Sequence, residues 1–131
     1  MKFVDIIDLR TIETWLRDED GARVCKCKIC FGNNSWSISE WFTASGYQNQ
    51  GYGNKTMRHA VQTLLEKTGT PNEIRYIWNG ANEYVYQWLT KHFSPTTLMP
   101  IEVQKTSSDD DWSNHIYILD KNKFLQYFAE D

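Results

Sequence analysis

Two glycines separated by a single residue, Gly51 and Gly53, lie in residues 48–53 (Gln-Asn-Gln-Gly-Tyr-Gly). An amphipathic, helix-like segment follows them. The first N–H groups of a helix have no intrahelical partner, and the helix dipole places partial positive charge there. Glycine removes the Cβ atoms that would keep an anion from the main chain, and Lys55 adds a mobile charge nearby. The segment therefore predicts an anion site such as a phosphate cradle, although a plain connecting turn is the alternative.

The flanking residues predict a strand and a helix that would position this turn. Residues 36–43 are rich in aromatic and β-branched side chains and follow the turn signal Gly32-Asn33-Asn34, so we expect a strand. Gly69 and Pro71 are expected to end the helix. Apolar side chains at helical spacing form its predicted buried face: Met57, Ala60, Val61, Leu64 and Leu65.

The spacing does not match the two familiar nucleotide-binding motifs. The dinucleotide fingerprint needs a third glycine where this chain has Thr56, and the P-loop needs four residues between its glycines and a Gly-Lys-Ser/Thr ending. Both motifs are therefore disfavoured.

The turn resembles the signature of the GNAT superfamily of acyl-CoA-dependent N-acyltransferases, Gln/Arg-x-x-Gly-x-Gly/Ala after the fourth strand. Gln48, Gly51 and Gly53 match it. A second strand–helix pair, residues 73–78 and 82–93, follows in the family's order. The resemblance implies that main-chain amides of the turn bind the pyrophosphate of coenzyme A. It assigns the cofactor site to Thr43, Gln48, Asn49, Gln50, Gly51, Tyr52, Gly53, Asn54 and Lys55, with Asn79 and Asn82 near the pantetheine arm.

The expected acid and base positions of the family are altered in this chain. Ser37 replaces the usual glutamate on the fourth strand, and Glu40 would point to the opposite face unless a bulge intervenes. Trp88 replaces the tyrosine that usually serves as general acid. Tyr84 and Tyr86 are the candidate acids, because a phenol can protonate a leaving thiolate. Core packing is the alternative role for both rings.

The resemblance implies an α/β (mixed α+β) fold with a central mixed, mostly antiparallel, splayed sheet flanked by helices. We expect one domain over residues 1–131, with antiparallel N-terminal strands and a more parallel C-terminal half. The implied reaction is direct attack of a primary amine on acetyl-CoA, or a close acyl-CoA, in a ternary complex without a metal. The alternative is a weak or inactive GNAT-fold protein that acts as an acyl-CoA-binding or protein-interaction module.

The N-terminal third is read as strands over residues 2–7 and 22–31, with residues 11–17 either a strand or part of a helix over 8–18. If they form a hairpin, part of the acceptor-binding wall is missing or comes from another subunit, so a homodimer stays open. In the C-terminal third, residues 101–105 and 115–119 are expected strands. Asp109, Asp110 and Asp111 lie between them and would favour a cationic acceptor, although a solvated loop is the simpler role. A closing helix is expected after the N-cap Asp120, with a buried face of Phe124, Leu125 and Phe128.

Composition excludes other functional classes. The 131 residues carry 14 Lys and Arg against 17 Asp and Glu, so there is no basic footprint for nucleic acid. No apolar run approaches the roughly 20 residues that span a bilayer, and we expect a cytoplasmic protein. Cys25 and Cys27 share one strand face and Cys30 takes the other, while the three histidines are scattered. Reduced thiols and no metal site are expected.

Overall fold

The computed structural model describes residues 1–78, 82–93, 102–105 and 113–129. Within this part of the chain, seven strands form one sheet in the order β1-β2-β3-β4-β5-β7-β6. Their bounds are Lys2–Ile7 (β1), Thr11–Arg17 (β2), Arg23–Gly32 (β3), Ser35–Thr43 (β4), Glu73–Trp78 (β5), Glu102–Lys105 (β6) and Ser113–Leu119 (β7). The helices are Tyr52–Thr68 (α1), Glu83–Phe93 (α2) and Lys121–Ala129 (α3).

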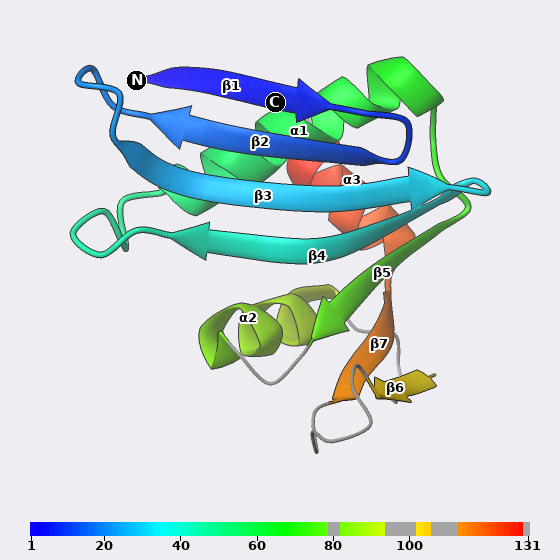
Figure 1. The fold of residues 1–131 in the computed structure, drawn as a ribbon. Coiled ribbons are helices and arrows are strands. Elements are labelled where there is room, and N and C mark those ends of the chain that lie inside the picture. The colour runs from blue at the N-terminus through cyan, green and yellow to red at the C-terminus, as the bar shows by residue number, and fades with distance from the viewer. Residues whose placement is uncertain (79–81, 94–101, 106–112, 130–131) are drawn as a thin grey trace.

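The first four strands form an antiparallel meander, and α1 and α3 lie behind it (Figure 1). Residues 11–17 are a strand rather than a helix because Ile12, Thr14 and Leu16 alternate into the core. The Asp8 carboxylate accepts the N–H groups of Arg10 and Thr11, which builds the turn that starts β2. The hairpin alternative is therefore confirmed, and β1 and β2 are joined without a helix.

One strand pair in the described sheet is parallel, β4 with β5, and α1 provides the crossover between them. The expectation of a more parallel C-terminal half holds for this pair, while the β5–β7 and β6–β7 pairs are antiparallel. After α2, the chain places β6 beyond β7, and β7 inserts antiparallel between β5 and β6. The broader expectation, a mixed and mostly antiparallel sheet flanked by helices, is confirmed.

The core lies between the sheet and the three helices. The expected face of α1 is buried at Met57, Ala60, Val61 and Leu64, while Leu65 is partly buried. Asp120 caps α3 by accepting the Lys123 N–H at 3.0 Å, as expected, and Phe124 and Phe128 are fully buried. No helix in the described residues is both long enough and apolar enough to cross a membrane.

Candidate functional site

The N-terminus of α1 is open in the way the sequence predicts. Gly51 is its N-cap with φ +82°, no side chain caps it, and the first turn carries no acidic residue. The first bond along the helix runs from the Lys55 N–H to the Gly51 carbonyl at 3.1 Å. The N–H groups of Tyr52, Gly53 and Asn54 precede that bond, so they lack intrahelical acceptors. They form a positive end that suits an anion.

Gly53 brings this helix end against the end of β4. The indole Nε1 of Trp41 donates to the Gly53 carbonyl at 3.1 Å. A Cβ built on Gly53 would lie 3.4 Å from Thr43 Oγ1 and 3.6 Å from Trp41 Nε1. These are ordinary contact distances, so the fold would accept an alanine here. Glycine at this position leaves the space between the helix end and β4, beside Thr43 and Trp41, free of a methyl group.

The turn over residues 44–51 is held by side chains. The Tyr47 hydroxyl donates to Asp18 Oδ2 at 2.9 Å, which ties the turn to the β2–β3 connection. Gln48 Nε2 donates to the Thr43 carbonyl, and Gln50 Nε2 donates to the Gly46 carbonyl, each at 3.4 Å. The backbone N–H of Ala22 and the Tyr47 hydroxyl lower the pKa of Asp18.

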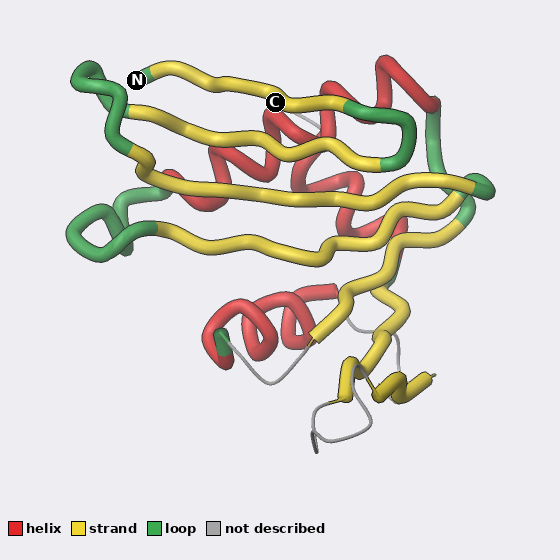
Figure 2. The backbone as a smooth tube through the Cα atoms, in the orientation of Figure 1, coloured by secondary structure: helices red, strands yellow, loops and turns green. Residues whose placement is uncertain are grey.

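The sheet opens beside this turn, because β4 and β5 pair only from Ser35 to Ile38 on the β4 side. Figure 2 shows the two strands diverging, with α2 next to the gap. The Ala44 N–H donates to the Val24 carbonyl of β3, so alternation turns the main-chain groups of Trp41 and Thr43 to the open edge. This stretch of β4 therefore offers backbone groups that β5 no longer pairs.

Side-chain amides satisfy the two carbonyls on the open edge. Asn82 Nδ2 donates to the Trp41 carbonyl at 2.8 Å, and Gln48 reaches the Thr43 carbonyl as described above. The N–H groups of Trp41 and Thr43 face the same gap. Two main-chain donors thus point toward the space between β4 and α2.

A bulge in β4 settles the position of Glu40. Ile38 pairs with Ile29 and Glu40 pairs with Lys28, so Ser39 is the extra residue. The bulge places Glu40 on the outward sheet face that Ser37 also occupies. There the Glu40 carboxylate forms an ion pair with the Lys26 ammonium, with Oε2 and Nζ 3.0 Å apart. The same Lys26 Nζ lies 2.7 Å from Glu13 Oε1.

A cavity of about 670 Å³ joins the α1 N-terminus to the open edge of β4. Its size falls in the usual range for small-molecule sites. The cavity is lined by Trp41, Phe42, Thr43, Gln48, Asn49, Gly51, Gly53, Asn54, Asn82, Tyr84, Val85 and Trp88.

The structure separates the two candidate tyrosines. Tyr84 lines the cavity and is 70% exposed. Tyr86 instead stacks on Trp78, with ring centroids 4.1 Å apart, and hydrogen bonds with Tyr117. Burial raises the pKa of Tyr117 to about 12, and the bond with Tyr86 adds to the shift. Of the two phenols, Tyr84 is the one placed to meet a ligand in this cavity.

Most of the predicted cofactor residues lie together. Gln50, Tyr52 and Lys55 do not line the cavity, nor does Glu40. Asn79, Asp109, Asp110 and Asp111 fall outside the described residues. The remaining predicted cofactor residues line it: Thr43, Gln48, Asn49, Gly51, Gly53, Asn54 and Asn82.

Sequence reasoning missed the wall formed by Trp41, Phe42, Val85 and Trp88. Trp41 and Trp88 meet edge to face, with centroids 5.5 Å apart. The signal for Trp41 and Phe42 was their place at the strand end before the glycine turn. Within the described ranges, no three His, Cys, Asp or Glu side chains gather as a metal site would require.

Solved acetyltransferases share this fold. Nourseothricin acetyltransferase matches with a TM-score of 0.61 at 9% identity, over 86% of this chain and 66% of that one. A GNAT-family protein from Desulfovibrio desulfuricans gives 0.58 at 13% identity, over 86% and 70%. The PaiA N-acetyltransferase from Thermoplasma acidophilum, in complex with coenzyme A, gives 0.56 at 14% identity, over 85% and 61%.

These likenesses establish the GNAT acyltransferase fold for this chain, which spans 61% to 70% of the length of the three proteins. No family sequence model and no curated protein sequence matches the chain. Fold and cavity geometry therefore carry the functional argument.

Proposed function

We propose that this chain is an N-acetyltransferase that transfers an acetyl group from acetyl-CoA to a primary amine. One observation carries the proposal: a single cavity joins the free N-terminus of α1 to the unpaired edge of β4. The N-terminus of α1 suits phosphates, and the unpaired edge of β4 suits an extended chain bearing amide groups. Coenzyme A contains both. The coenzyme A complex of a protein with the same fold supports this assignment.

The residues divide into two binding regions. The N–H groups of Gly53 and Asn54 would receive the pyrophosphate, and Lys55 would add charge from the next position of the helix. The N–H groups of Trp41 and Thr43 would bond the pantetheine arm or the acyl carbonyl in the manner of a missing neighbouring strand. Asn82 and Gln48 already bond the carbonyls on that edge. The open edge therefore offers donors to a ligand.

The reaction proposed for this site is direct transfer in a ternary complex. A neutral amine attacks the thioester carbonyl, a C–N bond forms, and the C–S bond breaks. The Trp41 N–H would stabilise negative charge on the carbonyl oxygen, and Tyr84 would protonate the departing thiolate. The amine loses its proton to water in the cavity, because Glu40 lies outside the cavity lining and is paired with Lys26. Juxtaposition of amine and thioester supplies much of the acceleration.

The acceptor remains a proposal in class only. Nourseothricin acetyltransferase shares the fold, which supports a small-molecule amine. We keep Asp109, Asp110 and Asp111 as a proposed attraction for a cationic acceptor. A single domain, a cytoplasmic location and a homodimer remain predictions.

Two observations favour a second function. Lys26 binds Glu40, and Trp88 holds the position of the family's usual acid. A weakly active or inactive protein that binds acyl-CoA, or one that associates with other proteins, would retain the fold without a free catalytic carboxylate or an acidic tyrosine at these positions.

Titration calorimetry with coenzyme A and acetyl-CoA tests the proposal, using Gly53→Ala as the informative variant. The fold accepts a Cβ at position 53, and alanine favours a helix by up to about 1 kcal/mol over glycine. We expect the melting temperature to hold while affinity falls at least about tenfold, because the methyl group would occupy cavity space beside Thr43 and Trp41. Gly32→Ala, with open space around it, is the control. No binding to the parent protein at millimolar ligand would refute the proposal.

A further inference from the structure

Among the described residues, β1 is an edge strand of the sheet with no strand beyond it. It is the first strand in the sheet order, and β2 is its neighbour on one side. Its register with β2 runs unbroken from Lys2 to Ile7, so the strand has no bulge, and it contains no proline. Natural edge strands are usually blunted by prolines, bulges, central lysines or a covering element. Among the described residues of β1, the charged side chains are Lys2, at its first position, and Asp5, which is turned toward α1.

Apolar side chains concentrate along this edge. Met1 is 52% exposed, Ile6 54%, Ile7 44% and Leu9 93%. These are four of the seven large apolar side chains exposed among the described residues. Because adjacent residues of a strand point to opposite faces, Ile6 and Ile7 expose apolar side chains on both faces of this edge.

The outward main-chain groups of β1 can be assigned. The Asp8 N–H donates to the Thr11 carbonyl at 3.0 Å, so Asp8 faces β2. Alternation then turns Val4 and Ile6 toward β2 as well. Phe3, Asp5 and Ile7 direct their N–H and C=O groups away from the sheet, toward the free edge.

We propose that this edge pairs antiparallel with β1 of a second copy of the chain, about a two-fold axis at Asp5. Phe3 would then exchange hydrogen bonds with the partner's Ile7, and Asp5 with the partner's Asp5. Val4 would lie against the partner's Ile6. Just beyond the strand ends, Lys2 would approach the partner's Asp8, and Met1 the partner's Leu9. The sequence Met-Lys-Phe-Val-Asp-Ile-Ile-Asp-Leu is thus self-complementary about its centre.

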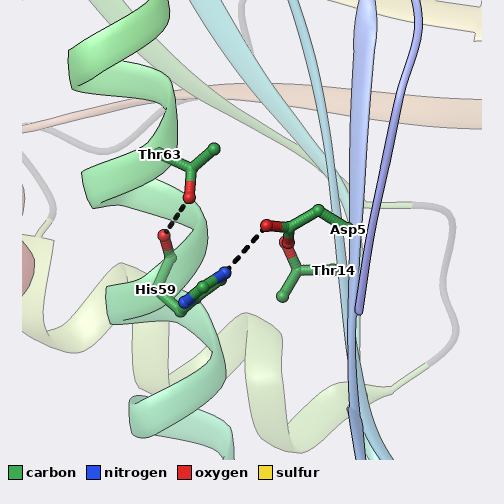
Figure 3. Close-up of polar contacts among 4 residues, drawn as sticks. All are labelled: Asp5, Thr14, His59 and Thr63. Atoms are coloured by element: carbon green, nitrogen blue, oxygen red, sulfur yellow. Dashed lines mark hydrogen bonds and ion pairs between the residues drawn. The ribbon is translucent and has the colours of Figure 1, made fainter. Parts of the chain in front are cut away.

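The two carboxylates at the axis are the one like-charged pair in this register, and the structure already directs them away from the edge. Asp5 Oδ1 accepts the Thr14 hydroxyl at 2.8 Å, and Asp5 Oδ2 contacts His59 Nε2 at 2.9 Å (Figure 3). Phe3 stacks on His59 with centroids 4.2 Å apart. The Asp5 side chain is therefore held toward α1 within its own subunit.

One neighbouring register fits less well. Side chains of a strand alternate between its two faces. Only registers in which the numbers of two opposed residues add up to an even number therefore keep the core-facing side chains of both copies on the same face. A register that places Phe3 opposite the partner's Asp5 sets a ring against a carboxylate.

Cross-linking tests this register, and it does not depend on the proposed acetyl transfer. In a Cys30→Ser background, Val4→Cys and Ile6→Cys proteins would be oxidised separately and as a mixture. We expect a disulfide-linked dimer mainly in the mixture, because Val4 lies opposite the partner's Ile6. Equal cross-linking in the separate samples, or none in the mixture, would overturn the register.

Proline substitution tests the edge itself in sedimentation experiments. Ile7→Pro removes an N–H that faces outward, so the subunit should keep its fold while the dimer dissociation constant rises about tenfold or more. Ile6→Pro is the matched control, because it removes an N–H that bonds β2 and should lower the melting temperature more. A parent chain that remains monomeric at the highest soluble concentration would refute the proposal, as would a dimer unaffected by a folded Ile7→Pro variant.

Discussion

The side-chain amide of Asn82 donates to the main-chain carbonyl of Trp41 across 2.8 Å, joining the start of α2 to the open edge of β4. Asn82 adopts φ +52° to do so, a conformation that favours asparagine and glycine. Its Oδ1 also accepts the Val85 N–H at 3.4 Å, within the first turn of α2. This one side chain therefore spans the gap that the proposed ligand would enter.

Replacing Asn82 by glycine should separate its hydrogen bonds from its backbone conformation. Asn82→Gly keeps the positive φ accessible but removes the tether to Trp41. We expect kcat/KM for acetyl transfer to fall about tenfold, since one lost hydrogen bond and a looser wall correspond to roughly 1.4 kcal/mol. Asn33→Gly is the control, because Asn33 also has φ +52° and lies in the turn between β3 and β4. Equal effects of the two variants would contradict a role in the site.

Gly51 should respond to substitution through its backbone. Its φ is +82°, and nothing lies within 4 Å of a Cβ built on it. Gly51→Ala should therefore cost about 1–2 kcal/mol of unfolding free energy from strain alone. Gly46→Ala, with φ +92° and similarly open space, should cost a comparable amount. Denaturant unfolding would measure both. Only Gly51→Ala should also weaken coenzyme A binding, and a parallel loss in both variants would argue against a specific anion site.

The two tyrosines of α2 should behave oppositely. Tyr84→Phe removes a hydroxyl that lines the cavity, so kcat should fall about tenfold to a hundredfold with little change in melting temperature. Tyr86→Phe removes the hydroxyl bonded to Tyr117, so stability should fall while kcat changes little. Steady-state kinetics and thermal unfolding of both variants would distinguish these roles. A normal kcat in Tyr84→Phe would exclude this phenol as the acid.

Acid should loosen the glycine turn through Asp18. The Ala22 N–H and the Tyr47 hydroxyl lower the pKa of Asp18 below its ordinary value of 3.8. Because the folded pKa is depressed, its stabilising effect is complete above that value and is lost as pH falls through the folded pKa. Asp18→Asn should therefore flatten the decline of stability below pH 3.8. Urea unfolding at neutral and acidic pH would measure this. An unchanged acid limb would show that other carboxylates govern it.

The sequence predicted those features that depend on local chemistry. The open helix end could be predicted because glycine spacing and helical periodicity are both local signals. The cavity wall could not, because Trp41 and Trp88 lie on separate elements and meet only after folding. The β4 bulge is similar: Ser39 and Glu40 give no local sign of it, and the pairing of Ile38 with Ile29 defines it. The exposed β1 edge also depends on sheet order, which Phe3 and Ile7 do not encode.

β4 belongs to two halves of the sheet that differ in the sequence distance between their contacts. With β3 it closes a series of hairpins between consecutive strands, whereas its parallel pairing with β5 requires α1 to be in place. Nearby contacts lose less chain entropy on forming than distant ones do. We therefore expect the meander to assemble first and β5 to join it later. Pulse-labelled hydrogen exchange would show Cys27 protected before Tyr76. The pairing of β4 with β5 would then form last during folding and be lost first during unfolding.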